Sequence, residues 1–483
     1  MAADFFDLDA TAQLAILASR RLSAVELLEG TLARHGQVNG RLNAVVAQDL
    51  DRARERARAI DDRRAKGDPL GPLAGLPMTI KDTFDVEGMP ASSGLEPLRH
   101  RRAQDAAAVG HIKRAGAMVW GKTNVPVMAG DWQSFNDLYG ATNNPWDLER
   151  TCGGSSGGAA AALASGMTAL ELGSDIGGSL RVPASFCGVF SHKPTWGLVS
   201  QLGHVPPRPG THAERDLNVV GPMARSARDL RLLLSVIENG PLAAKAPPAE
   251  LRGLKVGLWT EEAAFALDPD VRGVVEAFGE ALRGLGVDVR PIQSPVDAPT
   301  LLAAYQVLLG ALVGTDLGAP ALRQLQRLRG PAKLARAFGV GAGGWADLTL
   351  AYTASHAEWL EANETRARLG DQMADVFGMV DVIIAPIAPV AAFPHDHRSF
   401  ERRTLRLSDG STIPYTAMLR WIALATALGL PATAMPAGRS SEGLPVGVQI
   451  IGPRGADSRT LSIAEALEER LGGFERPPAL ETH

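Results

Sequence analysis

The sequence predicts an α/β protein whose core is a buried, mostly parallel β-sheet with helices packed against it. Two observations support this class: short apolar runs bounded by glycine and proline recur along the chain, and helical stretches separate several of them. The runs lie at 76–80, 117–120, 168–172, 256–259, 380–385 and 446–451. Continuous apolar runs, rather than alternating ones, are typical of strands that are covered on both faces.

Length and helical periodicity assign the remaining segments around this sheet. The chain has 483 residues, 45% of them hydrophobic, and its only soft boundary is 243–248, so we expect one continuous domain over 1–483. Residues 1–70 carry amphipathic helices that should pack outside the core, and 71–240 carry the sequence motifs. Residues 298–369 are helical with little strand character, and we expect them to form a cap or a wall of a substrate pocket.

Charge and cysteine content narrow the range of partners and compartments. The 49 basic and 53 acidic side chains give a net charge of −4, which leaves no basic excess for nucleic acid. Only two cysteines, Cys152 and Cys187, occur in this long chain, which indicates a reducing, cytoplasmic compartment. The sequence shows neither a signal-like N-terminus nor a run of about 18 apolar residues, so we expect no membrane span. We also expect a monomer or a homodimer.

Two glycine- and serine-rich segments, 152–158 and 173–179, are the strongest signs of a functional site. Glycine is costly to order, so two such segments rich in hydroxyl groups favour special backbone geometry over ordinary turns. Residues 153–157 match the nucleophile-elbow pattern G-x-S-x-G. A polar, proline-bearing stretch precedes them, however, where an elbow requires a buried strand.

Two lysine-containing segments can each be interpreted as part of a functional site or as ordinary structural segments. Residues 116–123 match the phosphate-loop pattern G-x-x-x-x-G-K-[ST], but their interior is bulky and apolar and Pro126 follows closely, so we expect no nucleotide binding. Lys81 ends the apolar run at 76–80, where burial would lower the pKa of its amine and let it act as a base. A simple ion pair with Asp82 remains the alternative at this point.

Taken together, these segments resemble the amidase signature family of serine hydrolases. The resemblance follows the chain in order through 76–82, 121–124, 144–146, 153–158, 173–183, 193–195, 220–223 and 443–449. It implies an amidase domain folded as a single large α/β/α sandwich, with a central mixed, mostly parallel twisted sheet covered by helices. The part of the chain that resembles the family least is 298–369.

The resemblance also implies a catalytic triad. Ser179 would be the nucleophile, Ser155 the bridging serine on a non-proline cis peptide, and Lys81 the terminal base. A lysine of low pKa can accept the proton of a serine hydroxyl, as in Ser-Lys variants of the serine triad. The oxyanion of the tetrahedral intermediate would be held by backbone amides of the second glycine-rich segment, namely those of Ile176, Gly177, Gly178 and Ser179.

Supporting roles follow from the same resemblance. Asp175 and Arg181 match family positions that fix the shape of the oxyanion loop, and Ser156 would help to orient the proton relay. Ala129 and Ser155 would contact the substrate. Neither a metal ion nor a cofactor is expected, because no ligand spacing typical of metal sites accompanies His395 and His397.

The implied activity is hydrolysis of small, largely apolar amides, including aryl amides, through an acyl-enzyme, with carbamates (urethanes) or esters as further substrates. One alternative is a Ser-His-Asp esterase that uses Ser155 with His395 or His397. A second is a non-hydrolytic or glutaminase-type subunit of an amidotransferase. The segment after 193–195 lacks the arginine and tyrosine that such glutaminase subunits tend to show, which argues against that role.

Overall fold

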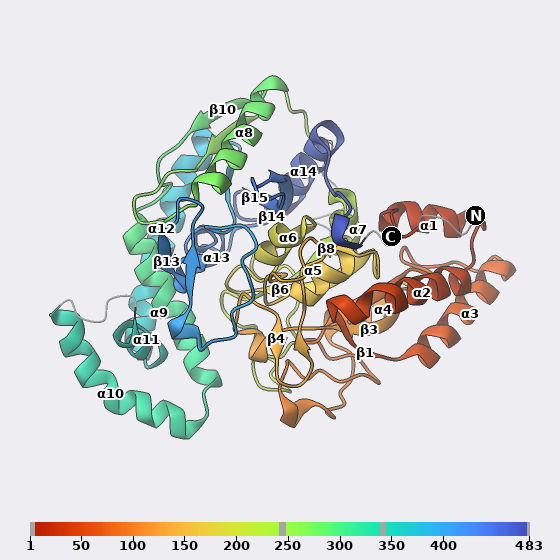
Figure 1. Cartoon of the computed structure of the whole chain (residues 1–483), viewed down its shortest axis with the longest axis horizontal. Coiled ribbons are helices and arrows are strands. Elements are labelled where there is room, and N and C mark those ends of the chain that lie inside the picture. The colour runs from red at the N-terminus through yellow and green to blue at the C-terminus, as the bar shows by residue number, and fades with distance from the viewer. Residues whose placement is uncertain (1–4, 241–247, 339–343, 481–483) are drawn as a thin grey trace.

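The computed structural model describes residues 5–240, 248–338 and 344–480. Within these ranges an eleven-stranded sheet runs through the centre of the molecule, and helices cover both of its faces (Figure 1). In spatial order the strands are β1 (Val45–Gln48), β3 (Met118–Thr123), β2 (Pro77–Lys81), β6 (Leu170–Asp175), β8 (Val219–Ala224), β7 (Phe190–Lys193), β14 (Ala432–Arg439), β15 (Pro445–Ile451), β11 (Val382–Pro386), β9 (Lys255–Leu258) and β10 (Asp288–Pro291). All six apolar runs identified in the sequence fall on strands of this sheet.

The sheet is mixed, as expected, but the prediction that it is mostly parallel is wrong. Four neighbouring pairs of the described strands are parallel: β3–β2, β2–β6, β11–β9 and β9–β10. The other six pairs, including the whole centre from β6 to β11, are antiparallel. One reason is that β14 and β15 are joined by a tight turn, and a short connection can only produce an antiparallel pair.

Helices complete the two outer layers. They are α1 (Ala10–Ala18), α2 (Ala24–Leu42), α3 (Leu50–Lys66), α4 (Ala107–Arg114), α5 (Gly157–Ala164), α6 (Arg181–Cys187), α7 (Ala227–Ile237), α8 (Pro269–Gly284), α9 (Ala298–Asp316), α10 (Ala319–Ala337), α11 (Trp345–Tyr352), α12 (His356–Met379), α13 (Ala423–Ala427) and α14 (Asp457–Leu471). Two short hairpins, β4–β5 (Phe135–Asn136 and Gly140–Ala141) and β12–β13 (Thr404–Arg406 and Thr412–Pro414), lie outside the main sheet. Two separate clusters of buried apolar side chains, which together draw on both helical layers, confirm the α/β/α sandwich.

The N-terminal helices form where the sequence predicts them, with one addition. A capping box between Ser23 and Glu26 starts α2, and α2 packs against α3. Between them, Val45–Gln48 forms β1 at the edge of the sheet. This strand is too short for its pattern to stand out between two long helices.

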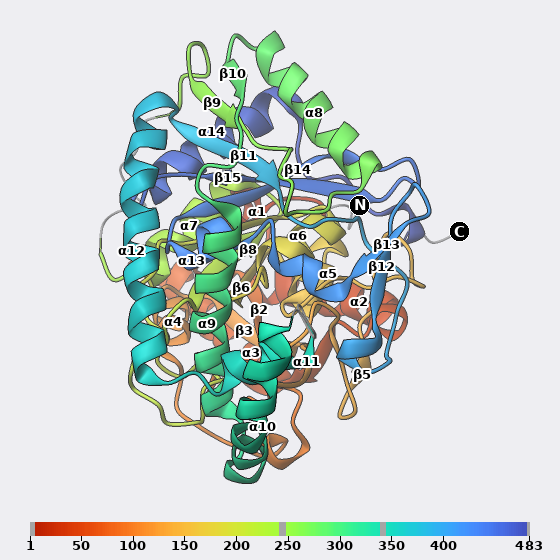
Figure 2. The same ribbon diagram turned by 90° about the vertical axis from the view of Figure 1, so that its left-hand side faces the viewer.

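Residues 298–369 form the helices α9 to α11, the first part of α12 and the short connections between them, apart from 339–343, which lie outside the described residues. In Figure 2, α9 and α12 lie side by side, and α11 packs against α9. The soft boundary predicted at 243–248 also falls almost entirely outside the described residues.

Helix α9 bears on the expectation that the chain has no membrane span. Among the described helices it alone is long and apolar enough to span a membrane, with a mean hydropathy of 1.4 over 18 residues. A packing role accounts for this composition, because α9 contacts α11, α12 and α13, and its residues Leu302, Leu309 and Val313 line a cavity. A helix that is apolar on several sides can therefore belong to the body of a globular fold.

Candidate active site

Sheet topology brings the predicted catalytic segments to one place. β2 ends at Lys81 and its parallel neighbour β6 ends at Asp175, so both carboxyl ends meet at the same edge of the sheet. The loop that carries Ser179 connects β6 to α6, and Ser155 lies just before α5. Lys81, Ser155 and Ser179 are all buried, with exposed fractions of 0%, 1% and 6%.

Lys81 and Ser155 form a direct hydrogen bond, with Nζ 2.8 Å from Oγ. The Gly154–Ser155 peptide is cis, which confirms that part of the prediction. The backbone N–H of Ser156 donates to the Ser179 carbonyl oxygen at 3.2 Å and so fixes the two serine segments against each other. Among the described residues nothing forms a hydrogen bond with the Ser179 hydroxyl, and catalytic hydrogen bonds often tighten only when substrate binds.

The surroundings of Lys81 favour its neutral form. Burial lowers the pKa of its amine to about 7, although the carboxylates of Asp175 and Glu171 oppose this shift. Asp82 does not pair with Lys81, which excludes the ion-pair alternative. The Asp82 carboxylate instead accepts from Lys122 Nζ at 3.4 Å and from the Ser92 hydroxyl. Lys81 is therefore able to accept a proton near neutral pH.

The loop at 176–179, which is predicted to hold the oxyanion, has hydrogen-bond partners on several sides. The N–H of Gly178 donates to Asp175 Oδ1 at 2.9 Å, so this predicted oxyanion donor already has an acceptor. The structure gives no acceptor, within its described ranges, for the N–H groups of Ile176, Gly177 and Ser179. These three amides are available to a negatively charged oxygen.

Two aromatic side chains orient this loop by its carbonyl groups. Tyr305 on α9 donates its hydroxyl to the Ile176 carbonyl at 2.8 Å, and Trp132 Nε1 donates to the Gly177 carbonyl at 2.8 Å. Because a peptide is planar and trans, holding the Ile176 carbonyl also fixes the direction of the next N–H, that of Gly177. Helix α9, within the part of the chain that resembles the family least, thus contacts the loop that carries Ser179 directly.

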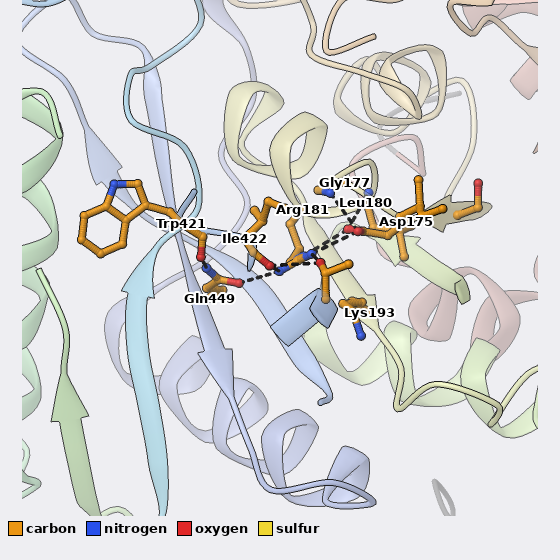
Figure 3. A network of polar contacts seen from close by, with 12 residues as sticks. Asp175, Gly177, Leu180, Arg181, Lys193, Trp421, Ile422 and Gln449 are labelled. Carbon is orange, nitrogen blue, oxygen red and sulfur yellow. Dashed lines mark hydrogen bonds and ion pairs between the residues drawn. The ribbon is translucent and has the colours of Figure 1, made fainter. Parts of the chain in front are cut away.

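Arg181 connects the loop at 176–179 to strand β15 and to the segment of helix α13 through hydrogen bonds, as Figure 3 shows. Its guanidinium is fully buried and contacts both carboxylate oxygens of Asp175 at 3.0 Å. It also donates to Gln449 Oε1 at 2.8 Å, to Thr426 Oγ1 at 2.7 Å and to the Ile422 carbonyl at 3.2 Å. Burial alone would raise the pKa of Asp175, but the Arg181 guanidinium holds this pKa below its usual range.

Ser156 and Ala129, the predicted relay-orienting and substrate-contacting residues, both lie close to the Lys81–Ser155 pair or to Ser179. The Ser156 hydroxyl donates to the Ser174 carbonyl at 3.4 Å, beside the amine of Lys81. Ala129 adopts a left-handed backbone with φ of 53° and lines the same cavity as Ser179. Left-handed backbone is uncommon for a residue with a side chain and is often found at functional sites.

A mainly apolar cavity of about 330 Å³ opens in front of Ser179. Its apolar lining comes largely from the variable helices and from two loops, and includes Trp132, Ile176, Leu302, Leu309, Val313, Leu348, Tyr352, Phe400 and Leu419. Asp131 also lines the cavity, but its carboxylate pairs with Arg403 and accepts from the Tyr415 hydroxyl at 2.7 Å. Arg420 lines the cavity as well, and among the described contacts its guanidinium donates to the Ala264 carbonyl rather than to a carboxylate. The cavity therefore suits a compact, largely apolar group.

The histidine alternative finds no geometric support. Among the described contacts the Ser155 hydroxyl has Lys81 as its partner, and neither His395 nor His397 reaches it. The His397 ring instead stacks on Phe135 with centroids 4.1 Å apart. The described residues contain no group of three or more His, Cys, Asp or Glu placed to hold a metal ion.

Two other features of the sequence are structural. Residues 118–123 form β3, which leaves the phosphate-loop match without a loop. Cys152 and Cys187 are both buried free thiols, and burial raises the pKa of Cys152 to about 12. Neither cysteine is therefore suited to act as a nucleophile.

Four residues at the site were missed by the sequence analysis. Trp132 and Tyr305 belong to segments that carry no motif, and Tyr305 lies 129 positions from its partner Ile176. Ser174 and His204 extend the hydrogen bonds of Lys81 away from Ser155. Only Ser174 had a signal, because it belongs to the second glycine- and serine-rich segment.

A family model described as Amidase matches residues 26–461. The chain therefore belongs to the amidase signature family, and it is an α/β enzyme that acts on C–N bonds as a hydrolase or an amidotransferase.

Comparison with individual proteins gives relatives of more than one activity. The chain is 33% identical over 504 residues to one subunit of the glutamyl-tRNA(Gln) amidotransferase of Salinispora tropica, covering 97% of this chain and 98% of that protein. The structure of a 6-aminohexanoate cyclic dimer hydrolase superposes with a TM-score of 0.78 and 27% identity, covering 99% of this chain and all of the other. A bacterial aryl acylamidase of the same family gives a TM-score of 0.78 and 25% identity, covering 96% of both chains.

Proposed function

We propose that this protein is an amidohydrolase that cleaves small, largely apolar amides, aryl amides among them, through an acyl-enzyme on Ser179. The observation that carries the proposal is the buried Lys81–Ser155 hydrogen bond of 2.8 Å beside an apolar cavity that Ser179 lines. The structural likeness to a bacterial aryl acylamidase supports this substrate class. A cytoplasmic location and the absence of a nucleic-acid partner belong to the same proposal.

In the acylation step, Ser179 Oγ attacks the carbonyl carbon of the amide. Its proton passes to Ser155 Oγ while the proton of Ser155 passes to the neutral Lys81. The free N–H groups of Ile176, Gly177 and Ser179 then stabilise the oxyanion. Lys81 returns the proton through Ser155 to the substrate nitrogen, the C–N bond breaks, and the amine leaves.

In the deacylation step, water attacks the acyl-enzyme and loses its proton along the same relay. The tetrahedral intermediate collapses, the proton returns to Ser179 Oγ, and the carboxylic acid is released. A carbamate or an ester would follow the same route, because only the leaving group or the acyl substituent differs. We therefore include carbamate (urethane) and ester hydrolysis in the proposal.

A second candidate, the glutaminase-type subunit of an amidotransferase, is favoured by the 33% identity to such subunits. In that case a protein partner would be required. The largely apolar lining and the pairing of Asp131 with Arg403 and Tyr415 favour the hydrolase, because the ammonium group of glutamine needs a free carboxylate at the site. Arg420 on the cavity wall could meet only the carboxylate of glutamine.

The test measures turnover of a p-nitroanilide, a matched p-nitrophenyl carbamate and glutamine by the isolated chain, with Ser179→Ala as the control. The proposal predicts turnover of the anilide by the wild type and none by Ser179→Ala. Ammonia release from glutamine without anilide turnover would instead identify the glutaminase-type subunit. Anilide turnover that survives in Ser179→Ala would refute the proposed nucleophile.

A further inference from the structure

Lys81, Ser174 and His204 are connected by a buried series of hydrogen bonds that the proposed mechanism does not use. Lys81 Nζ lies 2.9 Å from Ser174 Oγ, and Ser174 Oγ lies 2.8 Å from Nε2 of His204. The other ring nitrogen, Nδ1, lies 2.6 Å from the carbonyl oxygen of Pro206. Ser174 is 3% exposed and His204 is 6% exposed, so water does not compete for these contacts.

The direction of each hydrogen bond follows from the Pro206 carbonyl. A carbonyl oxygen can only accept, so Nδ1 of His204 must carry the hydrogen. Burial and the charge of Lys81 lower the pKa of His204 to about 3, which keeps the ring neutral and leaves a lone pair on Nε2. The Ser174 hydroxyl therefore donates to Nε2 and presents its oxygen lone pairs to Lys81.

This arrangement decides where the lone pair of Lys81 points. A neutral amine has two N–H groups, and Ser174 offers two acceptors to them, Oγ at 2.9 Å and the carbonyl oxygen at 3.5 Å. The remaining position around Nζ faces Ser155 Oγ at 2.8 Å. A Ser174 hydroxyl that was free to rotate could instead donate to this lone pair and compete with Ser155.

We propose that His204 is a positioning residue for the amidase reaction. By accepting from Ser174, it keeps that hydroxyl an acceptor toward Lys81 and so directs the lone pair of Lys81 at Ser155. This inference rests on the proposed function and extends it to a residue that does not line the substrate cavity. A defect at His204 should therefore lower kcat and leave KM unchanged.

The segment after β2 holds the imidazole in place. His204 pairs with Phe84 through an isolated β-bridge, and the two rings meet edge to face with centroids 4.9 Å apart. Phe84 follows Lys81 by three positions. One short stretch of chain therefore carries the proposed base, Lys81, and also packs against His204, the residue proposed to orient it. A side chain placed this rigidly can select one of two hydroxyl orientations.

The test compares kcat and KM of His204→Gln, His204→Leu and His204→Asn on a p-nitroanilide. Glutamine can place an acceptor oxygen near the position of Nε2, whereas leucine has no acceptor and asparagine is too short to reach Ser174. Loss of an outer contact that orients a functional group commonly costs on the order of 10- to 100-fold, which is the expected fall in kcat for the leucine and asparagine variants. His204→Gln should stay within about threefold of the wild type.

Several outcomes would overturn the inference. It fails if the leucine and asparagine variants both keep wild-type kcat, or if folded His204→Gln is as impaired as they are. A double-mutant cycle tests whether His204 acts through Ser174. In a Ser174→Ala background, adding His204→Leu should change kcat by less than about twofold. Independent, multiplicative effects would show that His204 does not act through Ser174. Failure of the proposed function is distinct, because it would appear as no wild-type turnover or as an active Ser179→Ala.

Discussion

Lys81 is expected to give the pH–rate profile an ascending limb near pH 7. Its folded pKa of about 7 lies well below the ordinary value of 10.5, because burial penalises the charged amine. At about 1.4 kcal/mol per pKa unit, this shift corresponds to a differential stabilisation of the neutral amine by about 5 kcal/mol. Only the neutral form accepts a proton from Ser155, so activity should fall as pH falls through the folded pKa.

The assay is kcat/KM for an uncharged anilide between pH 5 and 9 at constant ionic strength. One group with a pKa of about 7 leaves roughly 10% of the plateau at pH 6 and roughly 1% at pH 5. Glu171→Gln provides the matched perturbation, because the Glu171 carboxylate raises the pKa of Lys81 and its loss should move the limb to lower pH. A rate that still climbs tenfold per unit at pH 9 would refute a neutral Lys81, and so would a limb that Glu171→Gln moves upward.

Three further outcomes are expected. Arg181→Met should cost about 3–5 kcal/mol of unfolding free energy in a denaturant titration, because it leaves the buried Asp175 carboxylate without its counterion; a loss below about 1 kcal/mol would contradict this. Tyr305→Phe should lower kcat about tenfold, since the Ile176 carbonyl loses its donor at 2.8 Å, and unchanged kinetics would show that the loop keeps its shape alone. Cys152→Ala should retain activity, and the native thiol should resist a disulfide reagent until the protein unfolds.

Strand positions could be predicted from the sequence, whereas strand directions could not. The runs at 76–80 and 446–451 stand out because burial on both faces demands continuous apolar residues. An apolar run carries no sign of its direction, so the antiparallel centre around β8 and β7 was missed. β7 consists of residues 190–193, whose Ser191, His192 and Lys193 read as polar in the sequence and are nonetheless buried.

The site could be predicted only as far as its motifs extend. Ser155 and Ser179 lie in segments whose glycines and hydroxyls are unusual, and Lys81 ends an apolar run; together these segments are enough to identify a family. Tyr305 and His204 reach the site through tertiary contacts from helix α9 and from a proline-containing loop. Their roles depend on which atoms the fold places within hydrogen-bonding distance, and no local pattern encodes that placement.

The most direct test of the account is intact mass spectrometry after reaction with a fluorophosphonate, which forms a covalent bond with an activated serine and releases fluoride. We expect one adduct on the wild type, mapped by peptide digestion to Ser179, and no adduct on Ser179→Ala. Folded Ser155→Ala and Lys81→Met should react far more slowly, because the relay that activates Ser179 is broken. An adduct on Ser155, or full labelling of Ser179→Ala, would contradict the triad.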